Sequence, residues 1–161
     1  ARRKRGRKHL LAARGRRFDL QEIFSKLNRR FFKGELRAPR LGWSPKRSRS
    51  LLGHYDSAHQ TISISRWLDS SRVPRYLIEY LVFHEMLHMR YPVERAGQRR
   101  IVHSRTFREA EKKFPRFAQA RRRLKLICAH GLGCGALLRR EKVGLPGVAE
   151  SAGRKLPLES S

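Results

Sequence analysis

One short segment of this chain carries residues that can bind a metal ion and activate water. His84, Glu85 and His88 stand in the pattern His-Glu-x-x-His. On a helix, residues four positions apart lie on one face, so both imidazoles can reach the same zinc ion. Glu85 lies beside them, where it can take a proton from water whose pKa zinc lowers toward ~7. The motif predicts zinc hydrolase chemistry with Glu85 as catalytic base; the alternative is two core histidines bonded to backbone carbonyls.

A catalytic zinc ion takes a third protein ligand and leaves its fourth position to water. His103 is the best candidate, because it follows the motif after a loop and directly precedes a predicted helix that would hold it rigidly. Glu109 or Glu111 in that helix is the second choice. The remaining candidates by type are His9, His54, His59, His130 and Glu94. We therefore expect a metal site of His84, His88 and His103.

Other side chains could assist the reaction. A zinc peptidase stabilises the oxyanion of its transition state, and Tyr55, Tyr91 and His54 have suitable polar groups. Packing or surface positions fit these three residues equally well. An edge strand near the site could bind an extended substrate by strand addition, although the sequence does not show which strand lies at the edge.

The segment around the motif is apolar nearly all round, from Tyr76 to Met89. A helix of that composition is buried at the centre of its domain. Proline is tolerated in a first turn and ends a helix, so Pro74 and Pro92 mark its limits. Polar groups inside such a helix cost free energy unless they are satisfied, which favours a metal site.

Further helices are predicted on both sides of this central one. Asp19 and Glu22 form a capping-box pattern, after which apolar residues recur at helical spacing up to Phe31. Downstream, helices are expected at about 106–114, opening with a Thr106–Glu109 capping box, and at about 116–130.

Short β-compatible runs indicate a sheet between the first helix and the central one. They span 41–44, 51–55 and 61–65, and in the last run Ile62 and Ile64 alternate with polar residues. We expect an α+β fold, in which a small antiparallel sheet packs on the buried motif helix. Trp43 and Trp67 are expected to anchor the core or a face of the sheet.

The chain is strongly basic. Its 39 Lys and Arg against 13 Asp and Glu give a formal net charge of +26. Such a surface attracts polyanions, so nucleic acid is an expected partner, without sequence specificity. The last predicted helix adds a dense group of cations, Arg121, Arg122, Arg123 and Lys125.

Composition also divides the chain. Residues 1–17 are basic and without acids, and we expect a disordered arm; 18–130 form the domain, and 131–161 a mostly disordered tail. No run is long enough for a signal peptide or membrane span, so no membrane partner is expected. Cys128 and Cys134 are too few for a disulfide framework, which predicts reduced thiols and a cytoplasmic location, with nucleoid association as a further option.

The motifs resemble those of the SprT-like metallopeptidases, which include the eukaryotic protease Spartan. The matching segments are His84-Glu85-Met86-Leu87-His88, His103-Ser104-x-x-Phe107, Leu27-Asn28-x-x-Phe31-Phe32-x-Gly34, Leu41-Gly42-Trp43 and Ile62-x-Ile64-Ser65. The His-Ser-x-x-Phe segment is also similar to the related YgjP-like metallopeptidases. The resemblance covers roughly residues 19 to 117. It implies a compact zincin-like domain, three histidines on zinc, Glu85 as base, and peptidase activity on proteins associated with DNA.

Two departures from the family pattern stand out. Val102 and Ser104 flank the third ligand where many relatives have glycines. In place of a four-cysteine zinc ribbon the chain has only Cys128, His130 and Cys134, too few for a structural zinc.

Three functions fit these observations. The first is a zinc endopeptidase that the basic surface recruits to DNA or to DNA-bound proteins. The alternative is a nucleic-acid-binding protein with a structural, non-catalytic zinc, whose fourth coordination position Cys128 or an acid would fill. The third is a zinc hydrolase of a non-peptide bond.

Overall fold

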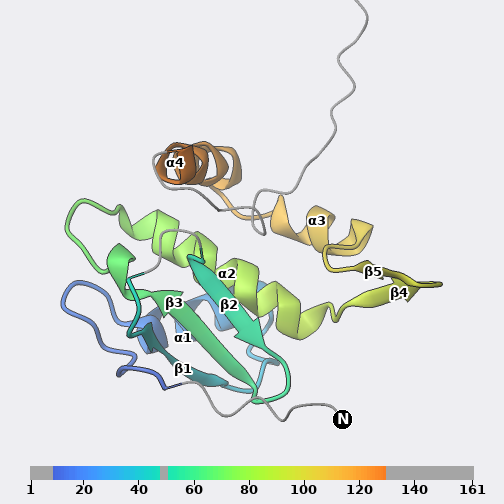
Figure 1. Cartoon of the computed structure of the whole chain (residues 1–161), viewed down its shortest axis with the longest axis horizontal. Helices are drawn as coiled ribbons and strands as arrows, with labels where there is room; N and C mark the ends of the chain where they lie inside the picture. Colours follow the sequence, from blue (N-terminus) through green and yellow to red (C-terminus); the bar gives the residue numbers. More distant parts are fainter. Residues whose placement is uncertain (1–8, 48–50, 130–161) are drawn as a thin grey trace, which may run out of the picture.

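The central element of the fold is the helix that carries the motif. The computed structural model describes residues 9–47 and 51–129 (Figure 1). Helix α2 (Arg75–Arg90) crosses the middle of the molecule, with the three-stranded sheet and α1 on one side and α3 and α4 on the other. It matches the predicted helix to within a residue at each end. The expected α+β fold is confirmed, with α2 against strands β2 and β3.

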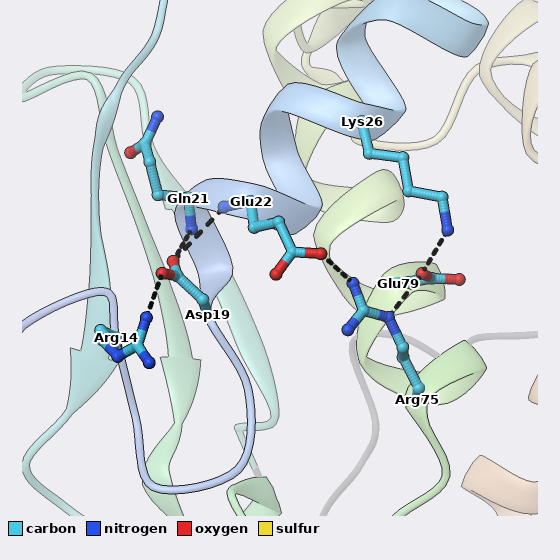
Figure 2. A network of polar contacts seen from close by, with 7 residues as sticks. All are labelled: Arg14, Asp19, Gln21, Glu22, Lys26, Arg75 and Glu79. Carbon is cyan, nitrogen blue, oxygen red and sulfur yellow. Dashed lines mark hydrogen bonds and ion pairs between the residues drawn. The ribbon is translucent and has the colours of Figure 1, made fainter.

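Helix α1 (Leu20–Phe31) packs beside α2. The side chain of Asp19 caps it by accepting hydrogen bonds from the backbone N–H groups of Gln21 and Glu22, as the sequence predicts. Figure 2 shows Arg75 of α2 bound to Glu22 of α1 at 2.7 Å. Exposed ion pairs of this kind contribute little stability, so the apolar face of α1 holds the two helices together.

The sheet has the order β1 (Arg40–Ser44), β3 (Thr61–Ser65), β2 (Gly53–Asp56). Strands β2 and β3 are antiparallel, whereas β1 and β3 are parallel. The expectation of a wholly antiparallel sheet is therefore wrong for β1. Strands β1 and β2 pair with opposite edges of β3, so β3 is the central strand. Both edge strands contact β3, which is buried along its whole length.

The segment 9–17, which the sequence predicts to be part of a disordered arm, is instead bound to the domain. The N–H of Leu11 donates to the Trp43 carbonyl at 2.9 Å, and Trp43 Nε1 donates to the Ala13 carbonyl at 3.0 Å. The Asp69 carboxylate accepts from the N–H groups of Arg16 and Arg17, at 2.6 and 2.9 Å. These backbone contacts outweigh the repulsion between the arginines. Residues 1–8 and 130–161 lie outside the described part of the chain.

After α2, the chain forms a β-hairpin that the sequence analysis does not predict. Strands β4 (Glu94–Ala96) and β5 (Arg99–Ile101) pair antiparallel, and nearly all their residues are exposed. With no buried face, the hairpin has no apolar alternation by which to recognise it. It leads directly to His103.

Two helices complete the described chain. Helix α3 (Arg105–Glu111) is shorter than predicted, and its cap is Ser104, whose Oγ accepts from the Phe107 N–H at 3.3 Å. The capping box predicted at Thr106 is therefore wrong. Helix α4 (Phe117–Ala129) follows, and a short 3-10 turn, η1 (Arg66–Leu68), comes before α2. Cys128 is disulfide-bonded, in contrast to the reduced thiol expected from the cysteine count. No described helix is long and apolar enough to span a membrane.

Candidate metal centre

The three histidines predicted to bind metal come together. His84 and His88 are one turn apart on α2, and His103 stands just before α3. Their ring centroids form a nearly equilateral triangle, with sides of 5.0, 5.1 and 5.0 Å. In the described part of the chain, they are the one group of His, Cys, Asp or Glu whose ligand atoms could hold an ion.

The distances suit a tetrahedral ion. Two nitrogens bound to zinc at ~2.1 Å with tetrahedral angles lie ~3.4 Å apart. The Nε2 atoms of His88 and His103 are 3.3 Å apart. Burial, followed by the neighbouring His84, lowers the pKa of His88 to about 3 and that of His103 to about 4. Both imidazoles are therefore neutral at pH 7, the form that coordinates metal.

A buried carboxylate orients His84. Glu111 Oε1 lies 2.7 Å from His84 Nδ1 and accepts from the Tyr80 hydroxyl at 2.6 Å. Burial opposes ionisation of Glu111, but hydrogen bonding and attraction to His84 outweigh it and lower the pKa of the carboxyl. Tyr80 keeps its proton, because burial raises its pKa. With Nδ1 bound to Glu111, His84 keeps Nε2 available for a metal ion at this site.

Glu111 was the second choice for third ligand, and the structure gives it a different position. It forms a hydrogen bond with His84 and is not one of the three residues that could hold an ion. No sequence signal separates these roles, because both require only an acid in the helix after His103. The packing of α3 on α2 decides between them.

Phe107, one turn after His103, lies beneath the three histidines. It is fully buried, and its ring centroid is 5.2, 4.7 and 4.7 Å from those of His84, His88 and His103. The apolar ring restricts the rotamers of all three imidazoles, so Phe107 helps to pre-organise the site.

Glu85 points from α2 toward β2. Its side chain is buried, and the backbone N–H of Tyr55 donates to its carboxylate. Gly53 makes room for it, because a Cβ at that position would lie 2.7 Å from Glu85 Oε1. Burial raises the pKa of Glu85 to about 7. A cation held by the histidines would lower this pKa and favour the carboxylate.

The other candidates have separate positions. His59 pairs with Asp56 at 2.9 Å, and Glu109 pairs with Arg105 at 2.8 Å. Tyr55 is hydrogen-bonded to Gln60. The remaining residues are Glu94 and His9, both exposed; Tyr91, which packs on Phe107; and His130, outside the described residues. Of the residues considered for the oxyanion, His54 of β2 is the one that acts electrostatically on His88.

Comparison with known families agrees with this geometry. The model of the SprT-like family matches residues 20–123, more than half of the chain. The chain belongs to the SprT-like family. The matched residues of this SprT-like chain include His84, His88, His103 and Glu85. No significant match occurs among curated proteins or among solved structures.

Proposed function

We propose that this SprT-like protein is a zinc metalloendopeptidase that hydrolyses peptide bonds, with Glu85 as general base. The observation that carries the proposal is the convergence of three imidazoles beside a buried carboxylate on the same helix. No fourth described His, Cys, Asp or Glu joins this group. A disulfide-bonded Cys128 has no thiolate to offer a metal. Both points favour an open catalytic site over a closed structural one.

The residues of the site divide the work between them. His84, His88 and His103 would hold the zinc, and Glu111 fixes the orientation of His84. Zinc, when bound, supplies Lewis acidity that polarises the peptide carbonyl and lowers the pKa of water. Glu85, which a bound zinc ion would keep in its carboxylate form, accepts the proton of the attacking water and passes it to the leaving amine. His54 is the candidate for stabilising the oxyanion.

Strand β2 is the candidate binding element for substrate. It lies at the edge of the three-stranded sheet and contacts α2, and Gly53 at its start touches Glu85. An extended peptide added along this edge would run past the catalytic carboxylate.

We further propose that the protein works close to DNA, on DNA-bound proteins, in the cytoplasm or at the nucleoid. The net charge of +26 supports attraction to nucleic acid. Arg122, Arg123 and Lys125 are exposed on α4 and available for phosphate contacts. Arg121 differs, because it is half-buried and acts electrostatically on Tyr80 and Glu111.

The decisive test compares zinc content and cleavage in three proteins. Wild type should bind one zinc and cleave casein. Glu85→Gln should keep the zinc and lose cleavage by about 10²-fold or more, as expected for loss of a general base. His103→Ala should bind zinc more weakly. If zinc is retained but wild type cleaves neither casein nor DNA-bound protein, with or without single-stranded DNA, the structural-zinc alternative replaces this proposal.

A further inference from the structure

A cavity lies on the neighbouring face of α2, and none of the three histidines lines it. It has a volume of ≈ 400 Å³, within the range of roughly 300–1,000 Å³ typical of ligand sites. Phe83, Leu87 and Arg90 line it from α2, whereas the metal ligands of this helix are His84 and His88. Its other walls come from the end of α1 and the segment after it, up to Leu36, and from Ala110 of α3 with Lys113 just beyond that helix. Neither the metal site nor the proposed reaction uses it.

The side chains of the cavity are of two kinds. Phe31, Leu36, Phe83 and Leu87 are among the apolar ones, and the Phe31 and Phe83 rings pack together with centroids 4.9 Å apart. The charged ones are three cations, Lys33, Arg90 and Lys113, and one acid, Glu35. The cations are exposed, and none of them forms an ion pair with another described residue. The cavity therefore combines apolar walls with an excess of positive charge.

This combination favours one class of partner. A large apolar side chain would gain free energy by leaving water for the apolar walls. Acids next to it in a peptide would reach the lysines and the arginine, and charge-assisted hydrogen bonds to carboxylates are the stronger kind. A nucleotide would satisfy the cations, but the lining has no Asn or Gln side chain to pair with the polar edges of a base, and burying unpaired polar groups costs free energy.

We propose that this cavity binds an acidic peptide segment, taking up one large apolar side chain while flanking carboxylates pair with Lys33, Arg90 and Lys113. The inference goes beyond the proposed peptidase function, because it concerns recognition at a separate face. It is tested by peptide binding alone, so its failure would not affect the proposed peptidase function. A failure of the peptidase proposal would likewise not affect the inference about the cavity.

The test measures the affinity of the full-length protein for a short fluorescein-labelled peptide with a central tryptophan between aspartates. A matched peptide has serine in place of tryptophan. The variant Lys33→Glu/Lys113→Glu reverses two cations of the cavity, and Ala110→Phe fills it without changing charge. Arg29→Glu/Arg72→Glu is the matched control, because it makes the same change in net charge at exposed residues that do not line the cavity. Thermal melting checks that every variant folds.

We expect the cavity double variant and Ala110→Phe each to weaken binding of the tryptophan peptide at least about tenfold, or ~1.4 kcal/mol. Ala110→Phe should leave binding of the serine peptide unchanged, and the control should change little. Equal affinity for both peptides, or equal losses in the control and cavity double variants, would overturn the proposal in favour of general charge attraction. Binding of an oligothymidine that Ala110→Phe weakens, with peptide binding unaffected, would assign the cavity to nucleic acid instead.

Discussion

The contact between Glu111 and His84 determines which nitrogen of that imidazole is free for a metal. Glu111 and Tyr80 are both buried. The Tyr80 hydroxyl donates to the same carboxylate oxygen that contacts His84, and so fixes the position of this oxygen. The imidazole is therefore held in one tautomer and one orientation. Outer partners of this kind commonly change metal affinity by about 10–100-fold.

Glu111→Gln tests this role. The amide keeps the shape of the side chain but loses the charge that favours the hydrogen bond from His84. We expect zinc affinity to fall about tenfold, within the range for such partners, with little change in the folded structure. Competition with a chromophoric chelator measures it. Glu109→Gln on the same helix is the control, because Glu109 pairs only with exposed Arg105; equal losses in both variants would contradict a specific effect on His84.

A substitution at Gly53 should affect catalysis without affecting metal binding. An alanine Cβ there would lie 2.7 Å from Glu85 Oε1, and the end of that flexible side chain would have to move. We expect Gly53→Ala to retain zinc while cleavage falls by about 10²-fold, because a general base must lie within hydrogen-bond reach of its proton. Zinc content and casein cleavage are measured on the same sample. Full activity would mean that Glu85 has room to remain in place.

Among the elements, the segment 9–17 is held at its end by the side chain of Asp69. Asp69 accepts from the N–H groups of Arg16, Arg17 and Phe18, and so holds this segment beside the sheet. Leu11 then extends the pairing to β1 through Trp43.

Asp69→Ala leaves these N–H groups without their acceptor. We expect a loss of about 1–3 kcal/mol in the free energy of unfolding, the usual cost of unsatisfied groups, at the lower end because Arg16 and Arg17 are exposed. Urea unfolding measures the change. Zinc content should stay at the wild-type level, since Asp69 does not contact the metal centre. A loss of zinc at full stability would show that the segment acts on the site rather than on the fold.

The elements also show what sequence patterns can and cannot specify. Helix α2 was predictable to within a residue at each end, because its burial imposes an apolar composition on all sides. The convergence of His84, His88 and His103 was predictable for a related reason, since coordination of a metal would fix their type and spacing. The direction of β1 was not, because parallel and antiparallel strands share the same alternation. The β4–β5 hairpin gave no signal, since it has no buried face, and the role of Glu111 depends on contacts 27 residues apart in the sequence.

On the scale of the whole molecule, the basic residues and the candidate metal centre occupy different places. The metal ligands and Glu85 lie in the centre, around α2, while most lysines and arginines are exposed. The basic surface can therefore change without altering the site. Affinity for nucleic acid and peptidase activity should then be separable by substitution.

Salt dependence tests this separation. Each phosphate contact with single-stranded DNA contributes ~0.7 to the slope of log affinity against log salt. If Arg122, Arg123 and Lys125 each neutralise one phosphate, replacing all three by glutamine should reduce the slope by about 2. Cleavage of a short peptide that carries no DNA should stay at the wild-type rate.

The matched control for that variant is Arg29→Gln/Arg37→Gln/Arg72→Gln, which removes as much charge from exposed residues outside α4. It should change the slope by less than the α4 variant, because the proposal assigns the phosphate contacts to the cations of α4. Equal changes would mean that the protein binds DNA through its net charge, with no preferred face. An unchanged slope in both variants would mean that basic residues outside these two groups contact the phosphates.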